Sequence, residues 1–372
     1  MKHRANILFW FLIACFLLHW LFFPLGVIKD KPLSGYYRLP GKVEFSAENY
    51  LNGSFQDSLD LYVNRKMGLV PGFTRIHHQL EYSAFDKLHA YDVHAGVDNY
   101  LFRYCKGCIT EGTFDPKALE DYITKYLIFQ DSVTAAGKNI VWVIAPDKNF
   151  VFSEKLSPEL KHPGEICAFY WTLKKAFKEK GVKFIDFNEL AFREKGKLQI
   201  PIFTKGGVHW SQAYAARCFD SLCRYLSQQT SLKIKNTIHY RKVDTPWDSD
   251  IDMEVASNLL APIPDCDFYL ADVTSESNAK KKKLLLIGDS FSYCWTWPGY
   301  VAKCFDPASE FWYYNRERNI LAGNRTVGNV DHTHTRENIA SFDTFVIVFT
   351  ALNAESLDYG FMNDVYGLPE MK

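Results

Sequence analysis

A short apolar run followed at once by a glycine and two polar residues constrains this chain more than any other stretch. Residues 284–287 (LLLI) have no polar position, which is typical of a strand buried on both faces of a parallel sheet. Gly288, Asp289 and Ser290 follow directly, so Ser290 lies at the carboxyl end of the expected strand. Ligands of open α/β sheets bind at that edge. Because aspartate and serine are also favoured helix N-caps, a purely structural role stays open at this point.

Other apolar runs alternate with helical patterns. Buried strands are expected at 140–145, 182–186 and 345–349, and helices at 54–66, 165–180, 211–229 and from 115 through 133. A hairpin is expected at 92–104, with Asp98-Asn99 as its turn, and one more strand at 311–319, whereas 230–283 is polar and turn-rich. Strands and helices that alternate at this rhythm indicate βαβ units and a parallel sheet.

Composition excludes some classes of function. The chain has 372 residues, with 43 Lys plus Arg against 43 Asp plus Glu, so no excess positive charge points to nucleic acid. Hydrophobic residues make up 47% and aromatic residues 16%, enough for a substantial packed core. Aromatic richness also suits carbohydrate-facing surfaces, but a large core produces it equally well.

The amino-terminal stretch 5–28 is apolar over about the length that spans a bilayer. No A-x-A-like cleavage site follows it, so an uncleaved signal anchor is expected over residues 1–29. Basic residues flank the stretch on both sides, and the positive-inside rule therefore favours one orientation only weakly. A juxtamembrane linker at 30–53 and a single domain at 54–366, outside the cytoplasm, would complete the chain.

An even number of cysteines beyond the anchor is compatible with disulfides in an exported domain, although sequence does not give their pairing. Cys105 and Cys108 form the only close pair, and without a second such pair they are poor support for a zinc site. A local disulfide or two free thiols explain them better. The eight cysteines beyond the anchor are Cys105, Cys108, Cys167, Cys218, Cys223, Cys266, Cys294 and Cys304.

A second motif supplies a base for the serine. His209 precedes Trp210 in a loop, and Ser211 is the expected N-cap of the next helix. A serine hydroxyl is a weak nucleophile until a neighbouring base takes its proton, and His209 could be that base. Backbone N–H groups at the Ser290 turn could then hold an oxyanion. Since 81 positions separate His209 from Ser290, only the fold can bring them together.

Ser290 in GDSFS and His209 in GVHW resemble the signature pair of the alginate O-acetyltransferase family of AlgJ and AlgX type. Further landmarks follow that family's order over about residues 50–355: VNRKMGLVPGFTRIHHQLEYSAF, GVDNYLF, VIAPDKNFVF and DSDIDMEVASNLLAPI. The resemblance implies an α/β fold of SGNH-hydrolase-like (flavodoxin-like) type, a parallel sheet with helices on both faces, behind an N-terminal transmembrane helix.

One departure from the family pattern concerns the carboxylate that orients the histidine. The pattern is Asp-x-His-Trp, and this chain has Gly207 in the aspartate position. In a serine triad, loss of that group can lower the rate about 10⁴-fold. Three explanations stay open: Asp331 or Asp147 substitutes, the site works as a Ser–His dyad, or the domain has lost catalysis and kept glycan binding.

The resemblance implies O-acetyl transfer to an exported polysaccharide by a single-pass protein of the cell inner membrane, with its domain in the periplasm. A multispanning membrane O-acyltransferase would supply the acetyl group, and the Ser–His mechanism requires neither metal nor cofactor. The Ser290 amide would form the oxyanion hole, supported by Gly288, Asp289 and Asn353. An esterase or deacetylase with the same residues is one rival function. A non-catalytic glycan-binding or assembly protein is the other.

Overall fold

The computed structural model describes residues 6–7, 9–11, 13–14, 17, 31–35, 44–66, 70–103, 116–160, 168–229, 232–277, 280–350 and 357–366. Most of the expected anchor at 5–28 and part of the linker lie outside these ranges. Within them, no helix combines the length and apolarity needed to cross a membrane. The chain divides into two compact units, one of Met1–His94 with Met253–Ile263 and one of Ala95–Asp252 with Pro264–Lys372.

The first unit is helical. Its helices are α2 (Ala47–Leu51), α3 (Ser54–Lys66) and α4 (Val70–Phe85), together with all but the first residue of α11 (Asp252–Ala256). The segment after α11 is tied to α4 by hydrogen bonds. His78 Nδ1 lies 3.1 Å from the Ser257 carbonyl oxygen, and the Ala261 N–H donates to Gln79 Oε1 at 3.1 Å. The helix expected at 54–66 is confirmed, because α3 has these bounds.

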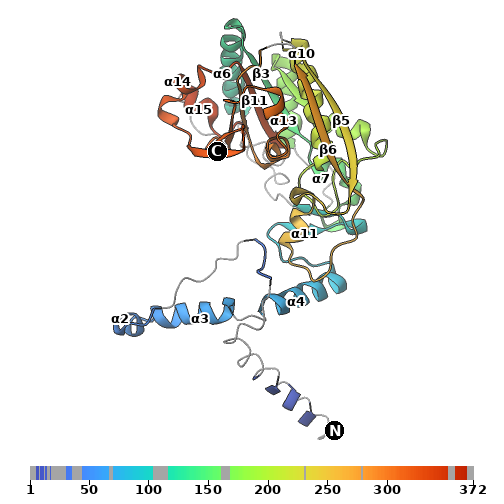
Figure 1. Cartoon of the computed structure of the whole chain (residues 1–372), viewed down its shortest axis with the longest axis vertical. Helices are drawn as coiled ribbons and strands as arrows, with labels where there is room; N and C mark the ends of the chain where they lie inside the picture. The colour runs from blue at the N-terminus through green and yellow to red at the C-terminus, as the bar shows by residue number, and fades with distance from the viewer. Residues whose placement is uncertain are drawn as a thin grey trace. The chain divides into compact units, whose positions relative to one another are not determined.

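A seven-stranded sheet organises the second unit, in the order β10-β9-β8-β7-β11-β3-β4. Figure 1 labels its strands β3 and β11. Its strands are β3 (Asn139–Ala145), β4 (Phe184–Asp186), β7 (Leu284–Gly288), β8 (Glu310–Tyr313), β9 (Glu317–Ile320), β10 (Arg325–Asn329) and β11 (Thr344–Thr350). Five neighbouring strands, from β8 to β4, are parallel. β9 and β10 are antiparallel, so the sheet is mixed rather than wholly parallel as expected. The strand expected at 311–319 is a hairpin instead, because Tyr314 and Asn315 take positive φ values.

Helices cover both faces of this sheet, as the sequence predicts. Alternate residues of β3 explain why: Val141 and Val143 pack with α10 and α13, whereas Ile140 and Trp142 pack with α6 and α8. Both faces are covered, so the strand is apolar from Ile140 to Ala145. The helices of this unit are α6 (Pro116–Ala135), α7 (Lys148–Val151), α8 (Ala168–Lys180), α9 (Phe187–Glu194), α10 (Gln212–Gln229), α12 (Tyr293–Thr296), α13 (Tyr300–Cys304), α14 (Thr335–Ile339) and α15 (Phe361–Tyr366).

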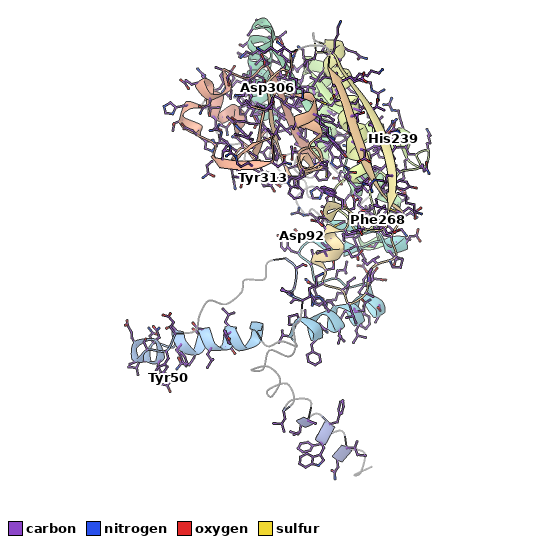
Figure 2. The ribbon with its side chains drawn as sticks, viewed as in Figure 1. Tyr50, Asp92, His239, Phe268, Asp306 and Tyr313 are labelled. Atoms are coloured by element: carbon purple, nitrogen blue, oxygen red, sulfur yellow. The ribbon has the colours of Figure 1, made fainter. Side chains whose placement is uncertain are left out.

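Two long strands were not expected from the polar stretch 230–283. β5 (Ile234–Val243) and β6 (Phe268–Ser277) pair antiparallel as a ribbon, and Figure 2 labels Phe268 at the start of β6. Only one side of the ribbon packs against the core, through residues such as Ala271 and Val273, so most of its positions are polar. Gln212 at the start of α10 accepts the Ala271 N–H at 2.7 Å.

Short elements complete the described chain. β1 (Val93–Ala95) and β2 (Leu101–Arg103) pair across η1 (Val97–Asn99), which confirms the hairpin with its turn at Asp98-Asn99. The remaining 3-10 helices are η2 (Ser153–Lys155), η3 (Pro158–Leu160), η4 (Asp248–Asp250), η5 (Ser290–Ser292) and η6 (His332–His334).

The five cysteines within the described ranges are free thiols, so they form none of the disulfides with which the sequence is compatible. Four are buried among apolar side chains, where they pack as small hydrophobic residues. Cys15, Cys105, Cys108 and Cys167 lie outside the described residues.

Candidate active site

Ser290 follows β7 at the carboxyl edge of the sheet. The Asp289 carboxylate accepts the Phe291 N–H at 3.0 Å and so caps η5, which is a structural role rather than that of an oxyanion donor. Gly288 leaves no space for a side chain, since a Cβ there would overlap Ser292 Oγ and lie 3.1 Å from Val348 Cβ. The turn that carries Ser290 is therefore tightly packed from behind.

His209 approaches the same edge from the loop before α10. Trp210 is fully buried and donates its Nε1–H to the Phe291 carbonyl at 3.2 Å, and Ser211 Oγ caps α10 by accepting the Tyr214 N–H at 3.1 Å. His209 Nε2 lies 2.8 Å from Ser290 Oγ. The structure thus brings the two signature residues into hydrogen-bonding contact, with the imidazole side chain 14% exposed.

The carboxylate beside His209 comes from Asp252, the first residue of α11. Asp252 Oδ2 lies 2.5 Å from His209 Nδ1, and Oδ1 accepts the Val208 N–H at 2.8 Å. An acceptor at Nδ1 holds the proton on that nitrogen and leaves Nε2 free to take the proton of Ser290. Ser290, His209 and Asp252 therefore form a line of the Ser-His-Asp type.

Neither carboxylate expected from sequence has this position. Asp331 is an exposed cap of η6, 2.9 Å from His334 Nδ1, and its bonds to Thr333 and His334 lower its pKa. Asp147 caps α7 by accepting the Asn149 N–H at 2.8 Å, and burial raises its pKa to about 6. The expectation that one of them replaces the family aspartate is corrected to Asp252.

Gly207 is glycine because the loop is packed against the segment before α11. A Cβ on Gly207 would lie 2.7 Å from the Ser249 carbonyl oxygen, and 2.8 Å from both the Asp250 carbonyl oxygen and Thr204 Oγ1. These distances are too short for any side chain. An aspartate therefore does not fit at position 207, and Asp252 instead supplies the carboxylate beside His209.

Gly207→Asp, which restores the family residue, is expected to harm the protein. Overpacking of this kind costs about 1–3 kcal/mol, so the urea midpoint of unfolding should fall, and Gly207→Ala should show a smaller fall in the same direction. In an Asp252→Asn background, Gly207→Asp should restore no activity. A midpoint equal to that of the wild type in both Gly207 variants would contradict the packing argument.

Two charged side chains hold the loop that leads to His209. Lys148 is buried and donates to the carbonyl oxygens of Lys205 at 2.7 Å and Gly207 at 2.8 Å. Burial lowers the pKa of Lys148 to about 7. Asp265 accepts the N–H groups of Lys205 at 2.7 Å and Gly206 at 2.9 Å. The imidazole is therefore held in place by a fixed backbone.

Asp250 is a buried carboxyl in the same segment. Its Oδ1 accepts the Gln212 N–H at 3.1 Å, whereas its Oδ2 has no partner among the described residues, and burial raises its pKa to about 7. In the unfolded chain, an aspartate carboxyl has a pKa of about 3.9. Between these values the folded state holds one proton more, so ionisation of Asp250 lowers stability as pH rises.

Asp250→Asn should therefore flatten the dependence of unfolding free energy on pH. Relative to the wild type, the variant should gain stability from pH 4.5 to pH 7.5 by at least about 1.4 kcal/mol, the equivalent of one pKa unit. Urea unfolding at the two pH values measures this difference. Parallel pH profiles for the two proteins would show that Asp250 does not titrate in this range.

Tyr314 is a neighbour of Ser290 that sequence analysis did not single out. It follows Tyr313, labelled at the end of β8 in Figure 2, and its φ of 49° turns the hairpin. Burial raises the pKa of its phenol, although the nearby Ser290 side chain acts in the opposite direction, so the phenol keeps its proton. Tyr359 packs edge-on against it at 5.2 Å between ring centroids. Asn353 lies outside the described residues.

A serine, a histidine and a carboxylate in line at the carboxyl edge of a helix-covered α/β sheet define an SGNH-hydrolase-like domain. The family model described as "SGNH hydrolase-like domain, acetyltransferase AlgX" matches residues 93–306, more than half of the chain. The chain belongs to this family, and the resemblance found in the sequence is confirmed.

Solved structures show similarity at low sequence identity. The O-acetyltransferase domain of Pseudomonas putida AlgJ is 16% identical, with 70% of this chain and 91% of that chain covered and a TM-score of 0.44. Pseudomonas aeruginosa AlgX is 15% identical, with 73% and 67% covered and a TM-score of 0.47. Bacillus cereus PatB1 is 11% identical, with 69% and 95% covered and a TM-score of 0.42. No curated protein sequence matches the chain.

Proposed function

We propose that this protein is an extracytoplasmic O-acetyltransferase that acts on an exported cell-surface polysaccharide through an acyl-enzyme on Ser290. The observation that carries the proposal is the line from Ser290 through His209 to Asp252. Ser290 Oγ lies 2.8 Å from His209 Nε2, and His209 Nδ1 lies 2.5 Å from Asp252 Oδ2. Membership of a family described as acetyltransferase supports the choice of acyl group.

In the first half-reaction, His209 Nε2 takes the proton of Ser290 Oγ as the oxygen attacks the acetyl carbonyl. Collapse of the tetrahedral intermediate leaves an acetyl ester on Ser290, and the imidazolium protonates the leaving group. Asp252 stabilises the imidazolium through Nδ1–H. In the second half-reaction, His209 takes the proton of a sugar hydroxyl, which attacks the ester and leaves as the O-acetyl sugar. Ser290 then regains its proton.

The oxyanion of each intermediate needs donors fixed in advance. The Ser290 backbone N–H is one candidate, and the Tyr314 phenol, which keeps its proton and lies near the Ser290 side chain, is a second. Asn353 stays a candidate from sequence. Gly288 and Asp289 shape the turn rather than donate.

We infer the location of the protein from its apolar amino-terminal stretch and its partners from the family resemblance. The apolar stretch 5–28 would anchor the chain in the cell inner membrane, with the SGNH-like domain in the periplasm. A multispanning membrane O-acyltransferase would deliver the acetyl group. The polysaccharide would meet the acetyl-Ser290 intermediate during export.

The test supplies an activated acetyl ester with and without oligosaccharide to the full chain in detergent. Acetate on the peptide that contains Ser290, followed by transfer to sugar hydroxyls, is the expected result. Release of acetate at the same rate with or without sugar would favour an esterase or deacetylase. Absence of an acetyl or sulfonyl adduct on Ser290, with glycan still bound, would replace catalysis by a glycan-binding or assembly role.

A further inference from the structure

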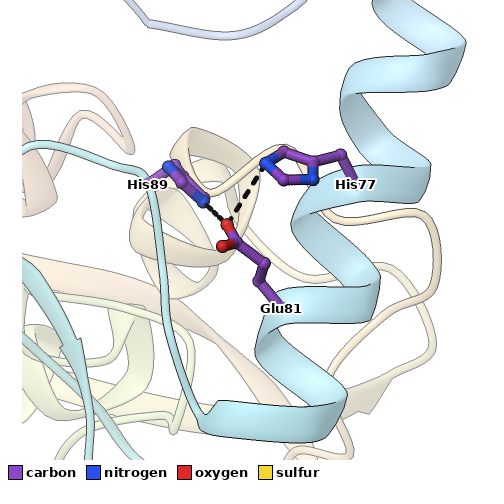
Figure 3. Close-up of side chains that lie close together, drawn as sticks. All are labelled: His77, Glu81 and His89. Atoms are coloured by element: carbon purple, nitrogen blue, oxygen red, sulfur yellow. Dashed lines mark hydrogen bonds and ion pairs between the residues drawn. The ribbon is translucent and has the colours of Figure 1, made fainter.

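Three side chains with metal-binding atoms converge in the first unit. His77 and Glu81 are four positions apart on α4, and His89 returns to the same place four residues after the helix ends (Figure 3). His77 Nε2 lies 3.3 Å from Glu81 Oε2, and His89 Nε2 contacts the same oxygen. All three ligand atoms lie within 4.8 Å of one another.

The separation of two of these atoms suits a tetrahedral ion. With Zn–N and Zn–O distances of about 2.0–2.1 Å, two tetrahedral ligands lie roughly 3.4 Å apart, close to the spacing of His77 Nε2 and Glu81 Oε2. The Lys87 ammonium binds the other carboxylate oxygen, Oε1, at 2.9 Å and leaves Oε2 for the ion. Two imidazoles and one carboxylate are a known ligand set for zinc.

Neighbouring groups hold one of the ligands in place. The His78 ring stacks on His89 with centroids 4.4 Å apart and an interplanar angle of 12°. His78 is itself fixed by its Nδ1, 3.1 Å from the Ser257 carbonyl oxygen. Such outer contacts orient metal ligands and raise affinity. The His77 side chain is 62% exposed, so an ion can enter from solvent.

We propose that His77 Nε2, Glu81 Oε2 and His89 Nε2 bind one divalent transition-metal ion of the zinc class, with water in the fourth position. The ion links the segment after α4 to the helix, because His89 is the only ligand of the three outside α4. Metal binding of this kind stabilises the folded state by mass action. The site is separate from the acetyl-transfer residues and supplies no step of that reaction.

The test titrates the tag-free full chain in detergent with Zn²⁺ against a chromophoric chelator, and with Co²⁺ monitored by its visible absorption. One equivalent should bind, with the intense bands of tetrahedral Co²⁺ and a rise in melting temperature. His77→Ala and His89→Ala should each weaken binding at least about 10-fold and abolish the rise in melting temperature. Circular dichroism checks that the variants fold.

His239→Ala is the matched control, because His239 is an exposed histidine on β5 (Figure 2). It should bind both metals as the wild type does. Absence of a saturable one-equivalent site in the wild type would overturn the proposal. So would a His77→Ala/His89→Ala double variant that binds Zn²⁺ with unchanged affinity.

Discussion

Ser290→Ala is expected to lower acetyl transfer about 10⁶-fold, to the background left by binding alone, because it removes the atom that carries the acetyl group. His209 and Asp252 would stay in place but would have no hydroxyl to activate. The measurement is sugar acetylation from an activated acetyl ester under saturating donor. Mass spectrometry of the acetylated intermediate should in parallel find no adduct on the peptide that contains position 290.

Ser292→Ala provides the control for this loss. Ser292 belongs to the same GDSFS motif and is buried, but its Oγ has no hydrogen-bond partner among the described residues. Its removal should leave the rate within a few-fold of the wild type. Transfer that persists in Ser290→Ala would show that the hydroxyl at 290 is not the acyl carrier. An equal loss in Ser292→Ala would show that the loss is not specific to position 290.

The parts of the fold that sequence predicted are those with local signals. β3, β7 and β11 are buried on both faces, so each is a continuous apolar run that can be recognised without knowledge of its neighbours. Ser290 and His209 were found for the same reason, since each belongs to a short motif. The sequence predicts one strand where the structure has the hairpin of β8 and β9, because the turn, Tyr314-Asn315, contains no glycine.

The triad carboxylate could not be identified in this way. Asp252 is 43 positions from His209 and belongs to a run with Asp248 and Asp250, three aspartates that look alike in sequence. Their environments separate them: Asp250 is buried and accepts the N–H of Gln212 at the start of α10, whereas Asp252 reaches His209 and the Val208 N–H. The signal that was available was negative, a glycine at 207 in a pattern that requires a carboxylate. It was equally compatible with a substitute acid, a Ser–His dyad and a loss of catalysis, and it did not point to Asp252.

Asp252→Asn is expected to lower kcat about 10⁴-fold while the protein stays folded, because an amide keeps the shape of the side chain and loses its charge. An asparagine can present its NH₂ to His209 Nδ1, which would place the imidazole proton on Nε2, facing Ser290. His209 could then no longer take the serine proton. The neutral asparagine side chain would also fail to stabilise the imidazolium of His209. The measurement is the acetyl-transfer rate, together with the rate of sulfonyl labelling at Ser290, and both should fall.

Asp331→Asn is the matched control, because Asp331 is an exposed carboxylate bound to a histidine on η6, outside the Ser290 line. The acetyl-transfer rate of Asp331→Asn should equal that of the wild type. Equal rates for Asp252→Asn and the wild type would instead mean that Ser290 and His209 act as a dyad. A loss confined to Asp331→Asn would return the acid role to the position that sequence suggested. Because Asp252 also binds the Val208 N–H, partial recovery of the Asp252→Asn rate as pH rises would identify lost charge, rather than lost loop structure, as the cause.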